Sequence, residues 1–227
     1  MILLLSTSDT DLITASASGA EYRVANPARI LVDDLAGLAD GADLVVIRIL
    51  GGVRAWEDGL AAAVALDKPL VVLSGEQAPD ADLMSHSTVP AGVALQAHFY
   101  LAQGGTENLR NLHAFVSDTV LMTGLGFGEP ESTPSWGLLD RPSGTEGPTV
   151  AVLYYRAQQL AGNTAYIEAL CQAIEQAGGR PLPIFCASLR TAEPELIELL
   201  GTADALLSTD SFWPWVLSYL CSIMGYE

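Results

Sequence analysis

Three short apolar runs stand out in the first third of the chain. Ile2–Leu5, Asp43–Leu50 and Lys68–Leu73 are rich in branched aliphatic residues and end in polar or glycine-containing turns, which predicts buried β-strands. Arg54–Asp67 carries its apolar residues at helical spacing. Strands that are apolar throughout and alternate with helices are typical of a parallel sheet covered on both faces. The predicted fold class is therefore α/β.

The period of the pattern changes between Val89 and Met122, where apolar residues recur every three to four positions. This spacing predicts two consecutive helices. Gly104-Gly105 divides them, and Thr106 is expected to be the N-cap of the second.

A glycine- and proline-rich stretch, residues 124–148, predicts a linker. Beyond it the alternation of apolar strands and amphipathic helices resumes, which predicts a second α/β unit. Its expected elements are strand Thr149–Tyr155, helix Ala165–Gln176, strand Arg180–Cys186, helix Glu193–Leu200 and a strand from Ala203 to Leu207.

The second unit is expected to be incomplete, because a doubly wound, flavodoxin-like or Rossmann-like domain normally has about five strands. Residues 208–227 carry little charge and do not continue the sheet pattern. We interpret this tail as the product of a frameshift or premature stop, with a short helix capping an open strand edge as the alternative. The predicted organisation is a head domain at 1–123, a linker at 124–148, a partial unit at 149–207 and a divergent tail.

Charge narrows the possible partners. Ten basic residues stand against 27 acidic ones, a formal net charge of −17, so neither nucleic acid nor an anionic membrane is an expected partner. Diffuse negative charge usually maintains solubility, and attraction to cations or a basic protein is the functional alternative. The longest uncharged apolar stretch, Ser211–Tyr226, is shorter than the roughly 20 residues of a spanning helix.

The three cysteines form neither a CxxC pair nor a disulfide framework. Cys171 and Cys186 lie in apolar patterns and are expected to be buried thiols. With no signal peptide at the start of the chain, a reducing cytoplasm is the expected location.

Five segments resemble the large subunit of cobaltochelatase, and the related large (H) subunit of magnesium chelatase is similar over the second unit. The resemblance is dense from residue 1 to about Leu207. The segments are ILLLSTSDTDL at Ile2–Leu12, ANPARI at Ala25–Ile30, and the longer stretches Asp43–Leu60, His98–Gly124 and Val150–Arg190.

This resemblance implies a tetrapyrrole-binding subunit that works with two smaller partners, one an AAA+ ATPase, to insert a metal ion. The cobalt branch acts on hydrogenobyrinic acid a,c-diamide in cobalamin (vitamin B12) biosynthesis. Members of the family are several times longer than this chain. The resemblance therefore implies no cofactor or catalytic residue here, with cobalt handled in the missing body and ATP with magnesium held by the partner subunit.

Potential site residues are few. His86, His98 and His113 are 12 and 15 residues apart, which is not a ligand spacing on one helix, so structural histidines are expected rather than a metal site. The loop Ser6–Asp11 follows the first strand, where α/β sheets bind ligands. It is expected to bind a polar group or a cation, or else to cap a helix through Ser8 or Asp9.

Tyr155, Arg156, Asn163 and Thr164 form the candidate substrate-binding set. Arg156 follows a strand and Asn163-Thr164 begins a helix, an arrangement suited to an anion such as a tetrapyrrole carboxylate. Simple capping with Asn163 as N-cap is the alternative. Gly51-Gly52 belongs to no nucleotide-binding motif, and no nucleophile motif indicates a hydrolase.

Two other functions remain open. One is a stand-alone, flavodoxin-like ligand-binding module. The other is a module that docks the chelatase partners without catalysis.

Overall fold

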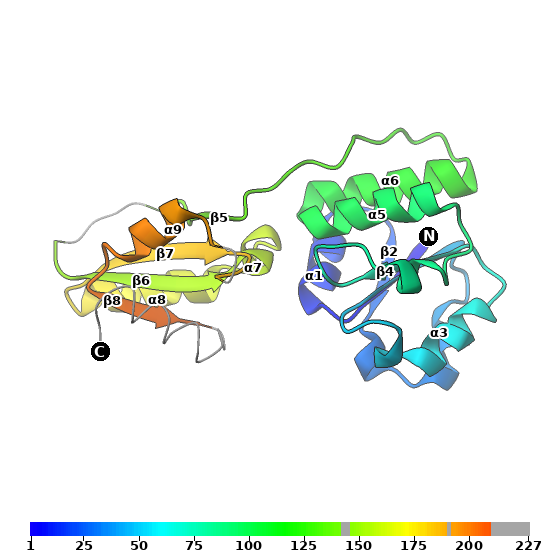
Figure 1. Ribbon diagram of the computed structural model, residues 1–227, viewed down its shortest axis with the longest axis horizontal. Coiled ribbons are helices and arrows are strands. Elements are labelled where there is room, and N and C mark those ends of the chain that lie inside the picture. Colours follow the sequence, from blue (N-terminus) through cyan, green and yellow to red (C-terminus); the bar gives the residue numbers. More distant parts are fainter. Residues whose placement is uncertain (142–145, 190–191, 210–227) are drawn as a thin grey trace. The chain divides into compact units, whose positions relative to one another are not determined.

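The computed structural model describes residues 1–141, 146–189 and 192–209. They form two compact units, Met1–Thr133 and a second that begins at Pro134 (Figure 1). Most of the predicted divergent tail lies outside the described residues.

The first unit is built on an entirely parallel sheet of four strands, as the apolar runs predicted. The strand order is β2-β1-β3-β4. The strands are β1 (Ile2–Ser6), β2 (Tyr22–Ala25), β3 (Leu44–Ile49) and β4 (Leu70–Ser74).

Both faces of this sheet are covered, because successive strand residues point to opposite sides. Ile2 and Leu4 pack against α1, α5 and α6, whereas Leu3 and Leu5 pack against α2, α3 and α4. The helices are α1 (Asp9–Ala17), α2 (Leu35–Leu38), α3 (Glu57–Val64), α4 (Ala81–Met84), α5 (Ala91–Gln103) and α6 (Thr106–Leu121), with 3-10 turns η1 (Pro27–Arg29), η2 (Val32–Asp34) and η3 (Val53–Ala55).

The two long helices α5 and α6 form the predicted helical pair. Gly104 and Gly105 join them with φ angles of 69° and 88°, which glycine adopts without steric cost. The prediction of Thr106 as N-cap is wrong. Gly105 occupies that position and Thr106 is the first helical residue, because the two left-handed glycines complete the turn one residue earlier.

A strap, residues 123–133, continues from α6 and runs back along that helix (Figure 1). Asp118 of α6 accepts the backbone N–H groups of Leu125 and Gly126 at 2.6 and 2.7 Å. Further bonds join the strap to Gln96, Tyr100, Gln103, Asn108 and Asn111. The first part of the predicted linker is therefore fixed to the first unit.

The second unit contains a mixed sheet of order β5-β7-β6-β8. Strands β6 (Thr149–Tyr155), β7 (Arg180–Cys186) and β8 (Ala205–Ser208) are parallel, and β5 (Trp136–Leu138) is antiparallel to β7. The α/β class is confirmed, and so are the bounds of β6 and β7. Strand β5 was not predicted, and it lies within the predicted linker.

Three helices pack on this sheet: α7 (Arg156–Leu160), α8 (Ala165–Gln176) and α9 (Pro194–Leu200). Helix α9 covers one face and α8 the other. Cys171 and Cys186 are buried free thiols, as predicted. Among the described residues, no helix is both long enough and apolar enough to span a membrane.

Candidate functional site

The carboxyl ends of β1, β3 and β4 meet at one edge of the first sheet, the edge at which open α/β folds bind ligands. A buried polar network occupies this edge. Arg48 of β3 places Nη1 at 2.9 and 3.0 Å from the two carboxylate oxygens of Asp11. Its Nε and Nη2 donate to the backbone carbonyls of Ser74 and Gly75. The hydroxyl of Ser6 donates to Asp11 at 2.6 Å.

For the loop Ser6–Asp11, binding of a polar group or a cation stays a prediction, and the alternative of helix capping is met in position only. Ser8 occupies the N-cap position of α1, but its side chain makes no capping bond. Asp9 instead accepts hydrogen bonds from Asn26 and Arg29, which lower the pKa of its carboxyl group. Because each carboxylate already faces an arginine, the loop serves to cross-link α1 to its neighbours.

His98 of α5 is a further buried polar residue near this edge. It is fully buried, its Nε2 lies 3.1 Å from the Gln77 carbonyl, and its Nδ1 has no partner within the described part of the chain. Burial lowers the pKa of His98, and the positive charge of Arg48 lowers it further. The ring is therefore neutral at pH 7, with Nε2 as the donor.

The described residues contain no group of three His, Cys, Asp or Glu side chains arranged to hold a metal ion. His113 is half-buried on α6, and burial lowers the pKa of its ring too.

The candidate substrate-binding residues lie at the carboxyl edge of the second sheet. Arg156 is the first residue of α7 and is only 8% exposed, and its Nε donates to the Pro134 carbonyl at 2.7 Å. Burial lowers the pKa of its guanidinium group. Tyr155 ends β6 and packs partly against the core beneath α9.

The other two residues precede α8. Thr164 is its N-cap and makes no side-chain capping bond, and the N–H of Asn163 donates to the Gln158 carbonyl. The alternative of Asn163 as N-cap is wrong, because the chain enters the helix one residue later. An anion role for the four residues stays a prediction.

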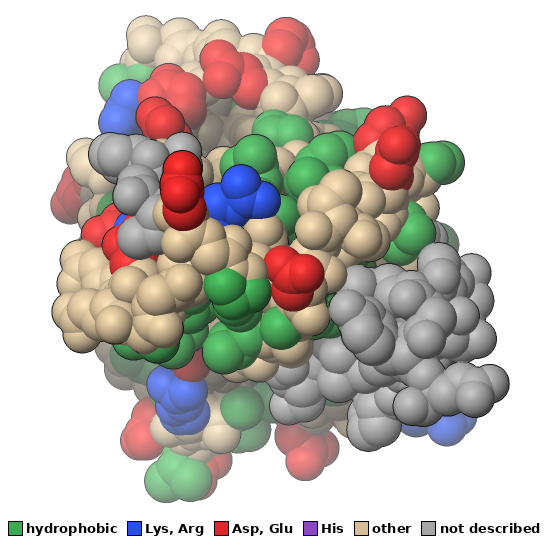
Figure 2. Space-filling view, turned by 90° about the vertical axis from the view of Figure 1, so that its left-hand side faces the viewer, with side chains coloured by type: hydrophobic (Ala, Val, Ile, Leu, Met, Phe, Trp, Pro, Cys, Tyr) green, Lys and Arg blue, Asp and Glu red, His purple; other side chains and the backbone are tan. Residues whose placement is uncertain are grey.

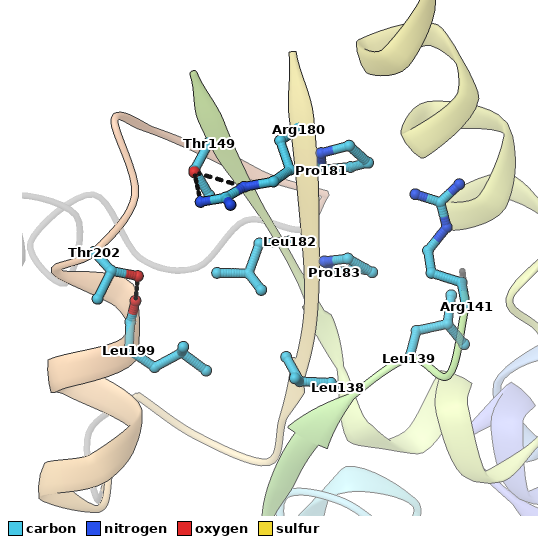
Figure 3. A pocket seen from close by; sticks show the side chains of 10 residues that line it. All are labelled: Leu138, Leu139, Arg141, Thr149, Arg180, Pro181, Leu182, Pro183, Leu199 and Thr202. Atoms are coloured by element: carbon cyan, nitrogen blue, oxygen red, sulfur yellow. Dashed lines mark hydrogen bonds between the residues drawn. The ribbon is translucent and has the colours of Figure 1, made fainter. Parts of the chain in front are cut away.

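A pocket of about 420 Å³ lies in the second unit, beside the first half of β7 (Figure 3). Its volume is within the range of small-molecule sites. Two arginines stand on opposite sides of β7, with the guanidinium of Arg180 turned toward Thr149. The lining residues are Leu138, Leu139, Arg141, Thr149, Arg180, Pro181, Leu182, Pro183, Leu199 and Thr202.

Sequence reasoning singled out the loop Ser6–Asp11 of the first polar cluster but missed its arginine, Arg48, and it did not find the pocket. The signal for the first was an arginine, Arg48, inside an otherwise apolar strand, since a buried arginine needs a carboxylate partner. For the pocket no signal existed, because Arg141 lies in the predicted linker and Arg180 begins a strand. Viewed from the left-hand side of Figure 1, the surface shows scattered acidic groups, with basic and hydrophobic atoms side by side near the centre (Figure 2).

Comparison with known proteins gives a consistent result. The family model described as CobN/Magnesium Chelatase matches residues 98–218, so the family pattern continues past Leu207, where the resemblance was expected to end. Aerobic cobaltochelatase subunit CobN of Pseudomonas aeruginosa is 30% identical over 184 residues, covering 73% of this chain and 15% of the relative. The corresponding protein of Sinorhizobium sp is 30% identical over 244 residues, covering 91% and 18%.

A solved structure adds a fold comparison. The catalytic subunit of cobaltochelatase from Mycobacterium tuberculosis superposes with a TM-score of 0.73 and is 64% identical, covering 92% of this chain and 18% of that one. The chain thus spans less than a fifth of the length of these relatives.

Proposed function

Because the chain belongs to the CobN/magnesium chelatase family, we propose that it acts as the N-terminal part of a cobaltochelatase large subunit. The parent complex would insert cobalt into hydrogenobyrinic acid a,c-diamide, with ATP hydrolysis, in cobalamin biosynthesis. One observation carries the choice of the cobalt branch: 64% identity over 92% of the chain to the Mycobacterium tuberculosis cobaltochelatase catalytic subunit.

The proposed contribution of these residues is structural and not chemical. Metal insertion needs a base for the pyrrole protons and ligands that release the ion. The chain covers only 15% to 18% of the curated relatives, so we assign those groups to the rest of the subunit. Cobalt would be the cargo of the reaction, and this chain alone would be inactive.

The proposed partners are two smaller chelatase subunits, one an AAA+ ATPase that holds ATP with magnesium. A net charge of −17 would favour docking to basic surfaces and would disfavour nucleic acid. We propose the cytoplasm as the location, which suits two buried free cysteines.

A chimera tests this proposal. Residues 1–227 of this chain would replace the matching segment of the Mycobacterium tuberculosis subunit, and cobalt insertion would be followed with the partner subunits, ATP and substrate. We expect a rate of the same order as that of the unmodified subunit. A folded chimera that inserts no cobalt would contradict the family role.

Two controls separate the roles of the segments. The 227-residue chain with the same partners should give no insertion, and turnover in that mixture would overturn the structural assignment. A chimera carrying an unrelated α/β domain of similar size should also fail, because it lacks the family's surfaces.

A further inference from the structure

The pocket beside β7 lies at an open stretch of sheet edge. Strand β5 pairs only with the end of β7, with Leu138 opposite Ile184. Upstream of this pair, Arg180–Pro183 has no strand on that side within the described residues. Four leucines and two prolines form most of the pocket wall.

Two prolines make this edge unsuitable for an added strand. The N–H of Arg180 donates to Pro148, toward β6, so the alternate residues Pro181 and Pro183 face the open side. The Pro183 carbonyl accepts the N–H of Leu139 there. Because proline has no N–H, this edge offers acceptors and no donors to an incoming strand. A peptide bound by strand addition therefore does not fit.

The polar groups of the pocket are arginines with unused donors. Nε and Nη2 of Arg180 donate to the Thr149 hydroxyl at 3.1 and 2.6 Å, and Arg180 forms no ion pair within the described residues. Arg141 pairs with Glu175, with Nη1 3.0 Å from the carboxylate Oε1. Since a guanidinium has five N–H donors, both groups retain donors for a ligand.

The lining is also unusual in its charge. Acidic residues outnumber basic ones 27 to 10 in the chain, yet the pocket wall includes two arginines and no Asp or Glu. Asp204 is close by, but it accepts the backbone N–H of Thr149 and does not line the pocket. A hollow with an apolar wall and arginines with unused donors suits an anion with an apolar body.

We infer that this pocket binds a small organic carboxylate, with its apolar part against Leu182 and Leu199 and its carboxylate on Arg180. Thr149 acts as a positioning residue, since its hydroxyl holds the guanidinium in place. The inference is independent of the chelatase assignment, because it concerns a site that lies wholly within the described second unit.

The test is an NMR titration of the ¹⁵N-labelled 227-residue chain with 4-phenylbutyrate in 0.15 M salt, with 4-phenylbutyramide as the neutral isostere. We expect saturable shifts of the Arg180 Nε–H signal with the carboxylate, and binding at least about tenfold weaker with the amide, since a charge-assisted bond is lost. Equal binding of the two probes would overturn the carboxylate assignment.

Variants locate the site. R180Q should weaken 4-phenylbutyrate binding about tenfold, and R180K, which keeps the charge but not the fork, should give an intermediate loss. R54Q removes the same charge from an exposed position in the first unit and should bind as the native chain does. Equal losses of 4-phenylbutyrate affinity in R180Q and R54Q would overturn the site. Tighter, Arg180-dependent binding of a hexaglutamate peptide would also overturn it and would indicate an acidic protein partner.

Discussion

Arg48 of β3 donates through Nη1 to both carboxylate oxygens of Asp11, which lies 37 residues earlier in the sequence. Neither side chain is more than 12% exposed. The pair ties the start of α1 to the centre of the first sheet. Its remaining contacts, to Ser6, Ser74 and Gly75, reach the ends of β1 and β4. The Arg48–Asp11 pair thus links three strand ends at the edge where such folds usually bind ligands.

Breaking this pair should be costly because it would leave a buried charge without a partner. We expect Arg48→Met to lower the free energy of unfolding of the first unit by about 3–5 kcal/mol. Native-state hydrogen exchange of the β1 and β3 amides measures this. The matched control is Arg29→Gln, which breaks the exposed pair with Asp9 and should cost less than about 1 kcal/mol. Similar small losses in both variants would show that burial adds nothing to the pair.

Acid should weaken the first unit through His98. Burial, which outweighs the hydrogen bond to the Gln77 carbonyl, lowers its pKa in the folded state. As the pH falls, the unfolded chain therefore takes up the proton before the folded protein does. The free energy of unfolding decreases below the ordinary histidine pKa, by at most about 1.4 kcal/mol per pH unit. His98→Gln should reduce the loss of stability between pH 7 and pH 5. An NMR titration in which the His98 ring protonates at or above the ordinary value would refute this.

The elements that the sequence predicted correctly are those with a strong apolar signal. Strands β6 and β7 and helix α8 have the expected bounds. Strand β6 is a nearly continuous apolar run, and the apolar residues of α8 recur at helical spacing. Helix α1 was not predicted. Only Thr14 and Ala15 of its nine residues are buried, so the sequence shows no apolar stripe there. Strand β2 is half-buried throughout and shows no clear alternation.

The candidate site could be predicted less well than the fold. Arg156 was chosen from its place after a strand, but its burial and its bond to the Pro134 carbonyl could not be predicted, because Pro134 lies 22 residues away in the predicted linker. The pocket residues Arg141 and Arg180 are 39 residues apart in the sequence, and both line the pocket because β5 pairs with β7. Such long-range pairing leaves no mark in local periodicity.

The strap should detach when Asp118 loses its charge. Hydrogen bonds from the Thr123 hydroxyl and the Leu125 and Gly126 amides lower the pKa of Asp118. The carboxylate therefore stabilises the strap fully at pH values above the ordinary pKa of an aspartate. This stabilisation is lost as the pH falls through the lowered pKa of Asp118. We expect Asp118→Asn to speed hydrogen exchange at Leu125 and Gly126, while the amides of β1 exchange as before.

A pH titration checks the same contact without a mutation. The Leu125 amide proton shift should follow Asp118 and change with a midpoint below the ordinary aspartate value. A midpoint at or above that value would mean that the carboxylate does not hold the strap in solution.

The pairing of β5 with β7 depends on the absence of a side chain at Gly137. Gly137 lies directly opposite Phe185 in the antiparallel register, and a Cβ at this position would come within 2.7 Å of the Phe185 ring. The ring is 6% exposed and packs against Tyr154, so it has little room to move. We expect Gly137→Ala to destabilise the second unit by about 1–3 kcal/mol.

Gly92→Ala, in the first turn of α5 with open space around its Cβ, should be neutral or stabilising by up to about 1 kcal/mol. Urea denaturation followed by amide signals of each unit distinguishes the two. If Gly137→Ala unfolds at the native urea concentration, β5 does not lie on β7 as described, and the pocket between Leu138 and Arg180 loses one of its walls.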